Sequence, residues 1–287
     1  MKLYLLFALL IIPLELLSLN LYELDPNKEY LKSGQKLMDL DYGLHDLEAN
    51  QTSKEILIGI HGRDSRGFEW IYPLQTIDNE VTKTYFFRWD TTKCPQKTIP
   101  ILMKEISAMK DIKKITILGH SYGGILSSLL LNEIEAIETE IHVIAAPLAS
   151  NDLKKYCGYT HPTSKNNNIS YHQWRTVKKL DYAFSSFDYD PQLIDFIESS
   201  VVRLPRQYRG KRLGHLWSIS WVADNINLDY KIFTTQYDEI VKAENLENAD
   251  EATKLRKSLD QQLIGFQDII TKLANKLQRQ LLAKQNR

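Results

Sequence analysis

Apolar residues in the middle of the chain occur in two alternating patterns. Short β-branched runs predict buried strands, and stretches where apolar residues recur every three or four positions predict helices. The predicted strands cover residues 55–60, 84–89, 115–118, 140–146, 169–178 and 200–204, and the predicted helices cover residues 68–77, 100–109 and 125–137. Strands that alternate with helices predict an α/β fold with a mostly parallel central sheet and helices on both faces. Residues 21–53 favour a small helix and allow an edge strand.

The N-terminal segment has a different pattern. After Lys2, residues 3–14 are uninterruptedly apolar, a run shorter than the roughly 20 residues of a membrane-spanning helix. This predicts a signal peptide in residues 1–20, although no small-residue pair marks a cleavage site. We therefore expect an exported protein, periplasmic or secreted, or one tethered to a membrane by this uncleaved segment. A cytosolic protein with an apolar N-terminal helix is the alternative.

The C-terminal segment is charged and lacks turn signals. Apolar residues recur in steps of three and four from Leu255 to Leu281, which predicts a long amphipathic helix within residues 238–287. Its apolar stripe could cover its own domain, pair with a second copy as a coiled coil, or meet a membrane or another partner. Residues 21–237 are expected to form one α/β domain.

Composition narrows the classes of partner. The chain has 287 residues, of which 43% are hydrophobic, enough for a sizeable core. Lys plus Arg and Asp plus Glu both number 36, so no basic field indicates a nucleic-acid partner. Cys94 and Cys157 each follow a predicted strand at one sheet edge. One disulfide and two free thiols both remain open, and two isolated cysteines do not indicate a metal site.

The candidate chemistry lies between the strand at 115–118 and the helix that follows it. Residues 119–124 read GHSYGG, which predicts a sharp strand-to-helix turn with Ser121 exposed at its apex. Gly119 and Gly123 would allow the strand and helix backbones to approach closely. The N-terminus of a helix favours a developing negative charge. Ser121 is therefore a candidate nucleophile.

This pattern resembles the nucleophile elbow of the α/β-hydrolase superfamily, particularly its lipase and esterase branches. The resemblance implies an α/β-hydrolase fold and an oxyanion hole built from two backbone amides. One amide follows the nucleophile, at Tyr122, and the other lies in the loop that begins with His61 and Gly62, at Arg63. In this superfamily a helical lid is often inserted at the place that corresponds to residues 147–169 of this chain. This short segment implies a minimal lid and an open site that suits a soluble or bulky ester.

The family order of nucleophile, acid and histidine implies the partners of Ser121. His215 follows the last predicted strand and is the candidate base, with His161 as the alternative. Strand positions for His142 and His172 indicate core histidines, and His120 is expected to pack beside the nucleophile without transferring a proton.

The candidate acid lies after the penultimate predicted strand. Asp181 matches the place where lipase-like relatives carry this group, and Asp188 and Asp190 remain alternatives. An acid at this place would orient the base through its second ring nitrogen.

Together these residues imply a serine hydrolase that cleaves a small-molecule or lipid carboxylic ester through an acyl-enzyme. This chemistry needs no cofactor and no metal ion. Thioesterases, amidases, peptidases and acyltransferases use the same intermediate, so they remain alternatives. A non-catalytic scaffold that binds a partner through the C-terminal helix is the alternative from a different class.

Overall fold

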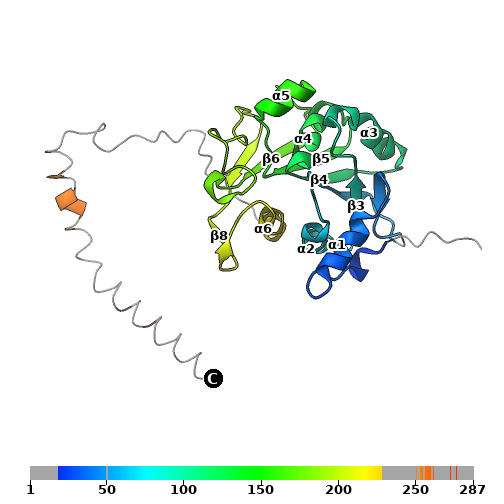
Figure 1. Cartoon of the computed structure of the whole chain (residues 1–287), viewed down its shortest axis with the longest axis horizontal. Coiled ribbons are helices and arrows are strands. Elements are labelled where there is room, and N and C mark those ends of the chain that lie inside the picture. The colour runs from blue at the N-terminus through cyan, green and yellow to red at the C-terminus, as the bar shows by residue number, and fades with distance from the viewer. Residues whose placement is uncertain are drawn as a thin grey trace, which may run out of the picture. The chain divides into compact units, whose positions relative to one another are not determined.

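The computed structural model describes residues 19–49 and 51–227, and beyond them residues 250, 253, 254, 256–259, 261, 272 and 276. The chain divides into two units, Met1–Thr234 and Thr235–Arg287. The first unit contains the central sheet and all the candidate site residues (Figure 1).

A seven-stranded sheet forms the centre of the first unit, in the order β1-β3-β2-β4-β5-β6-β7. The strands are β1 Gly43–Asp46, β2 Glu55–Ile60, β3 Thr82–Arg88, β4 Lys114–His120, β5 Glu138–Ile144, β6 Ile169–Arg175 and β7 Ser200–Arg203. β1 runs antiparallel to β3, and the other neighbouring pairs are parallel. The predicted mostly parallel sheet is confirmed, and the antiparallel edge strand is the one that residues 21–53 allowed.

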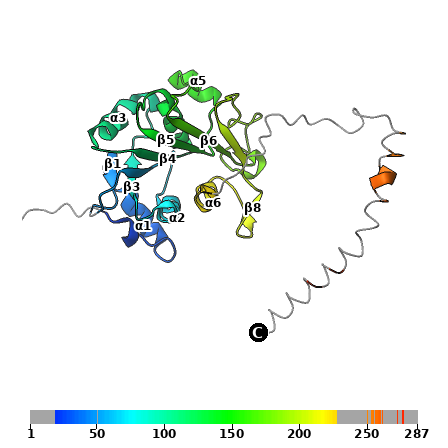
Figure 2. The same cartoon turned by 180° about the vertical axis from the view of Figure 1, so that it is seen from behind.

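Helices cover both faces of this sheet. The described α-helices of the first unit are α1 Tyr30–Met38, α2 Phe68–Ile77, α3 Ile99–Ala108, α4 Tyr122–Ser128, α5 Asn151–Cys157 and α6 Trp217–Asn225. Short 3-10 turns lie at η1 Leu21–Glu23, η2 Pro95–Lys97, η3 Leu129–Asn132 and η4 Lys178–Leu180, and a small hairpin joins β8 Gln207–Tyr208 to β9 Lys211–Arg212. Figures 1 and 2 show α1, α2 and α6 on one face and α3, α4 and α5 on the other.

The continuous apolar sequence of β2 reflects burial on both faces. Ile56, Ile58 and Ile60 join the core beneath α3 and α4, whereas Leu57 joins the core beneath α1, α2 and α6. Alternate side chains of a strand point to opposite faces, so a strand covered on both sides has no polar alternation.

Most predicted bounds differ from the structure by one or two residues, and α6 and the β8–β9 hairpin have no predicted counterpart. Three other differences involve α4, β6 and α5. The helix after Ser121 begins earlier, at Tyr122, and gives way to η3 after Ser128. β6 ends at Arg175 because the backbone N–H of Thr176 donates instead to the side chain of Gln192, at 2.8 Å. α5 forms where only a loop was predicted.

The unexpected helix α5 has recognisable ends. The Ser150 hydroxyl accepts a hydrogen bond from the backbone N–H of Leu153, and Gly158 adopts a left-handed conformation with φ 63° after the last turn. These are common N-terminal and C-terminal capping residues. A disulfide joins Cys157, at the end of α5, to Cys94 after β3, with a Cα–Cα distance of 5.4 Å.

The two ends of the chain lie largely outside this description. Residues 1–18, which carry the predicted signal segment, are outside the described residues, as is most of the predicted C-terminal helix. The described residues between 250 and 276 are helical. Within the described part of the chain, no helix is long and apolar enough to span a bilayer.

Candidate active site

Ser121 lies in the turn between β4 and α4 with a backbone conformation unusual for a residue with a side chain. Its φ is 54° and its ψ is −119°, a strained combination that surrounding packing must hold in place. A Cβ at position 123 would lie 2.2 Å from the Ile60 carbonyl oxygen, and one at position 119 would lie 2.2 Å from the Ser127 hydroxyl. Gly119 and Gly123 therefore permit the close strand-to-helix packing that holds this turn.

His215 and Asp181 meet in the interior. His215 Nδ1 lies 3.0 Å from Asp181 Oδ2, and the two residues are 5% and 0% exposed. A carboxylate oxygen accepts, so Nδ1 donates and Nε2 is left to accept a proton. Among the three candidate aspartates, the structure brings Asp181 to His215. Asp188 is exposed, and Asp190 accepts a hydrogen bond from the backbone of Gln192.

Two further groups hold the Asp181 carboxylate. The Thr176 hydroxyl donates to Oδ2 at 2.6 Å, and the Ala183 backbone N–H donates to Oδ1 at 2.9 Å. Each carboxylate oxygen thus has a donor that fixes its direction. The sequence reasoning missed Thr176, and no motif in the sequence marks it.

His120 and Ser218 hold the backbone of His215. His120 Nε2 donates to the His215 carbonyl oxygen at 3.1 Å, and the Ser218 hydroxyl donates to the same oxygen at 2.5 Å. Burial, and then the neighbouring His215, keep the pKa of His120 well below its ordinary value. A neutral His120 donates one fixed hydrogen bond, so this residue positions the loop that carries His215. The sequence predicted only that His120 packs beside Ser121.

Ser121 and His215 line one pocket of about 250 Å³. Arg63 borders this pocket, and a Cβ at Gly62 would lie 2.8 Å from the Cβ of Ser121. Tyr122 is the first residue of α4, so its backbone N–H has no acceptor within the helix. Arg63 therefore borders the Ser121 pocket, and Tyr122 directly follows Ser121.

His61 braces the loop that carries Gly62. Its Nδ1 donates to the Gly62 carbonyl oxygen at 2.8 Å, and its Nε2 accepts from Arg88 at 2.8 Å and from the Trp89 backbone at 3.3 Å. Burial lowers the pKa of His61 to about 4. The neutral ring is required because a proton on Nε2 would face the donors of Arg88 and Trp89.

The remaining candidate histidines lie elsewhere. His161, the alternative base, lies 3.0 Å from the Tyr171 hydroxyl and lines a different pocket, and burial lowers its pKa to about 4. His142 is buried in β5 and accepts a hydrogen bond from Trp174 at 3.1 Å, and its ring stacks on that of His172. Within the described parts of both units, no group of three or more His, Cys, Asp or Glu residues could hold a metal ion.

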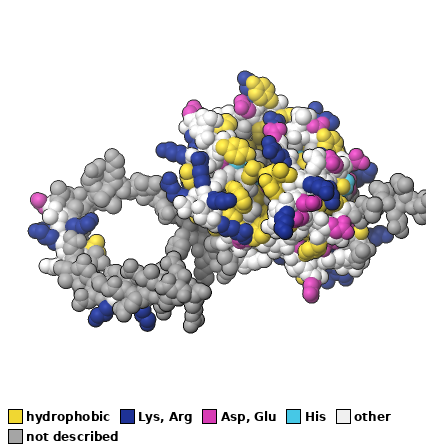
Figure 3. Space-filling view, turned by 60° about the horizontal axis from the view of Figure 1, so that its bottom comes forward, with side chains coloured by type: hydrophobic (Ala, Val, Ile, Leu, Met, Phe, Trp, Pro, Cys, Tyr) yellow, Lys and Arg dark blue, Asp and Glu magenta, His cyan; other side chains and the backbone are white. Residues whose placement is uncertain are grey.

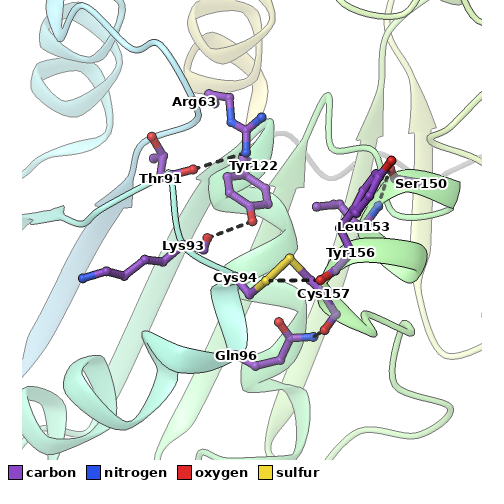
Figure 4. Close-up of a disulfide and its surroundings, with 10 residues drawn as sticks. All are labelled: Arg63, Thr91, Lys93, Cys94, Gln96, Tyr122, Ser150, Leu153, Tyr156 and Cys157. Atoms are coloured by element: carbon purple, nitrogen blue, oxygen red, sulfur yellow. Dashed lines mark hydrogen bonds between the residues drawn. A yellow bond between two sulfur atoms is a disulfide. The ribbon is translucent and has the colours of Figure 1, made fainter.

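The segment that leads from β3 to the disulfide at Cys94 contacts both candidate oxyanion residues (Figure 4). The Tyr122 hydroxyl donates to the Lys93 carbonyl oxygen at 3.0 Å, one residue before Cys94. The Arg63 guanidinium lies 5.1 Å from the centroid of the Tyr122 ring and donates to the Thr91 carbonyl oxygen at 3.4 Å. The disulfide thus anchors a loop that packs against the site.

No protein-family model matches the chain. Similar solved structures include the esterase domain of a Rhodothermus marinus protein, with 11% identity, a TM-score of 0.44 and coverage of 65% of this chain and 88% of that one. An esterase from Exiguobacterium antarcticum has 12% identity, a TM-score of 0.41 and coverage of 64% and 92%. A lidless α/β serine hydrolase from Xanthomonas campestris has 12% identity, a TM-score of 0.40 and coverage of 63% and 83%. With its mostly parallel sheet, helices on both faces and a serine in the turn between β4 and α4, the chain has the α/β-hydrolase fold.

Proposed function

We propose that this protein is a serine hydrolase that cleaves carboxylic esters through an acyl-enzyme. One observation carries the proposal. Ser121, at a strained strand-to-helix turn, shares a pocket with His215, whose other ring nitrogen lies 3.0 Å from the buried Asp181. A serine, a histidine that can take its proton and an acid that orients the histidine are the groups that nucleophilic acyl transfer needs.

In the first half of the reaction, His215 Nε2 takes the proton of the Ser121 hydroxyl as Oγ attacks the ester carbonyl carbon. The carbonyl oxygen becomes negatively charged, and the backbone amides of Arg63 and Tyr122 donate to it. Each well-placed donor lowers such a barrier by about 3 kcal/mol. His215 then gives its proton to the departing alcohol, which leaves the acyl group on Ser121.

In the second half, His215 takes a proton from a water molecule that attacks the acyl carbon. The tetrahedral intermediate collapses, and the proton returns to Ser121 Oγ as the carboxylic acid leaves. Asp181 keeps Nδ1 as the donor throughout, and Thr176 and His120 keep the acid and the base in place.

The test is labelling with a fluorophosphonate probe, together with hydrolysis of p-nitrophenyl esters. We expect the natural protein to label and hydrolyse, and Ser121→Ala to do neither. Asp181→Asn should lower kcat by about 10⁴-fold, because an amide can leave the wrong nitrogen of His215 protonated. Asp188→Asn is the matched control, since Asp188 is exposed, and it should retain activity. Circular dichroism checks that each variant folds.

Three outcomes would redirect this assignment. A folded natural protein that neither labels nor hydrolyses favours the alternative of a scaffold that binds a partner. A protein that labels but prefers thioesters or anilides to matched oxygen esters is a thioesterase or an amidase. A preference for an added alcohol over water as acceptor indicates an acyltransferase.

We also propose that the protein is exported or membrane-tethered. The disulfide between Cys94 and Cys157 supports this proposal, because such bonds persist in oxidising compartments and are rare in the cytosol. The apolar N-terminal segment supports it independently.

A further inference from the structure

A second and larger cavity adjoins the Ser121 pocket. It has a volume of about 640 Å³ and lies among the segment before α1, the helices α2 and α6, and the β8–β9 hairpin. Glu69 and Leu216 line both cavities, and Leu216 directly follows His215. The two cavities are therefore neighbours, separated by the side chains of Glu69 and Leu216 that they share.

Aromatic rings form much of the wall of this cavity. Tyr30, Phe68, Tyr72 and Trp217 all line it. Trp217 is 47% exposed and Tyr30 is 40% exposed. Figure 3 shows hydrophobic side chains gathered in the middle of one face of the molecule, with Lys and Arg side chains beside them. Exposed aromatic surface in a hollow favours an apolar ligand that stacks on the rings.

One polar network joins the three elements α2, α6 and the β8–β9 hairpin in the wall of this cavity. Tyr72 on α2 donates a hydrogen bond to Asp224 on α6, and Tyr208 on β8 donates to the same carboxylate. Arg209 also bonds Asp224, at 3.1 Å, and its guanidinium lies 4.7 Å from the Tyr72 ring centroid. A wall held before binding loses little entropy when a ligand enters.

The charges around the cavity favour an uncharged ligand group. Lys28, Arg209 and Glu69 are the charged residues of the lining. The Arg209 guanidinium is paired with Asp224, so much of its charge is already balanced. Lys28 and Glu69 have opposite charges, so the lining carries no excess of one sign that would select a charged group.

We propose that this cavity binds a bulky apolar group of the ester cleaved at Ser121, and that Trp217 and Tyr30 determine specificity for it. The inference rests on the proposed esterase function and names its substrate class. The pocket at Ser121, of about 250 Å³, holds the reacting carboxyl group. The cavity of about 640 Å³ falls within the roughly 300–1,000 Å³ of small-molecule sites. The apolar group belongs to either the acyl or the alcohol part of the ester.

Three esters test the inference and distinguish these two sources. Methyl acetate is small on both sides, 2-naphthylmethyl acetate has a bulky alcohol, and methyl 2-naphthylacetate has a bulky acyl group. Release of acid is followed in a pH-stat for the full chain and for Trp217→Ala and Tyr30→Ala. Tyr156→Ala is the matched control, because this tyrosine of α5 is 71% exposed and does not line the cavity.

We expect Trp217→Ala to lower kcat/KM about tenfold for one naphthyl ester, mainly through KM, and Tyr30→Ala to act in the same direction. Hydrolysis of methyl acetate and the rate of fluorophosphonate labelling should stay within twofold of the natural protein. The naphthyl ester that loses activity identifies the acyl or the alcohol part as the bound group.

Each other result overturns the inference in a recognisable way. If the natural protein is active and both variants hydrolyse all three esters at the natural rate, the cavity does not select the substrate. The esterase function then stands. An equal loss for all three esters indicates a structural role for these rings. A folded natural protein that neither labels nor hydrolyses overturns the esterase function and this inference with it.

Discussion

Individual side chains acquire their chemistry from burial and from hydrogen bonds. His215 and His61 are both buried loop histidines, but they have different partners. His215 Nδ1 donates to Asp181, which leaves Nε2 as the nitrogen that can accept a proton, whereas both nitrogens of His61 are occupied by Gly62 and Arg88. In the proposed mechanism His215 exchanges a proton with Ser121, whereas His61 braces a loop.

The buried His61 should make stability depend on pH. Its pKa is about 4 in the folded protein, and an unfolded histidine has a pKa of about 6.5. Between these values the unfolded state binds the proton and the folded state does not, so the free energy of unfolding falls as pH drops from 6.5 to 4. His161 and His172 have the same depressed pKa and act in the same direction.

His61→Gln isolates this contribution, because glutamine can donate to Gly62 and accept from Arg88 without titrating. Urea unfolding at pH 7 and pH 4.5 should show a smaller loss of stability for this variant, by at most about 3 kcal/mol. His45→Gln, at the edge strand β1, serves as control and should keep the natural pH dependence. An unchanged slope for His61→Gln would contradict the assignment.

At the scale of elements, the turn from β4 to α4 depends on close backbone packing. Gly123→Ala would place a Cβ 2.2 Å from the Ile60 carbonyl oxygen. Backbone atoms must move to relieve such a contact, so we expect a loss of stability of about 3 kcal/mol or more. The displaced turn should also slow labelling of Ser121 by a fluorophosphonate probe.

Gly158→Ala is the matched comparison. Gly158 has a positive φ of 63°, but no atom lies within 4 Å of a Cβ built there. This substitution should cost only about 1 kcal/mol of backbone strain and leave the labelling rate unchanged. Thermal unfolding and labelling rates measured on both variants separate the packing effect from the backbone effect. Equal losses in the two variants would show that packing at the turn is not the cause.

The local sequence pattern predicts the bounds of some helices and strands correctly and those of others incorrectly. Residues 55–60 and 68–77 were predicted with the bounds of β2 and α2, because burial and periodicity along a short stretch decide them. β6 ends three residues early because Gln192, distant in sequence, takes the N–H of Thr176. α5 was missed although Ser150 and Gly158 carried its capping signals.

At the scale of the whole molecule, the disulfide ties together segments 63 residues apart in sequence. Closing a loop of this length in the unfolded chain contributes about 4 kcal/mol in the chain-entropy model. Cys94→Ser with Cys157→Ser should therefore lower the free energy of unfolding by about that amount. Chemical denaturation with and without a reductant measures it.

The double variant should be insensitive to reductant, whereas the natural protein should be destabilised by it. Alkylation of the natural protein, without prior reduction, should leave both cysteines unmodified if the protein matures in an oxidising compartment. Free thiols in the freshly isolated protein would contradict export. If a reductant leaves the free energy of unfolding of the natural protein unchanged, the disulfide does not have this structural role.

The sequence alone determined the features that depend on neighbours along the chain. Apolar runs and helical spacing predicted the parallel sheet and most helices, and a glycine-flanked serine between a strand and a helix predicted the turn at Ser121. Local backbone preference and burial decide these features, and both depend on the residues within a short stretch of the sequence.

Only the tertiary structure decided which distant residues meet. It brought Asp181, rather than Asp188 or Asp190, to His215, and it joined Cys94 to Cys157. It also brought the Thr176 hydroxyl within hydrogen-bonding distance of Asp181 and formed the aromatic cavity beside the Ser121 pocket. These contacts join residues from separate elements, and their distances depend on how the whole sheet and its helices pack, which no local pattern encodes.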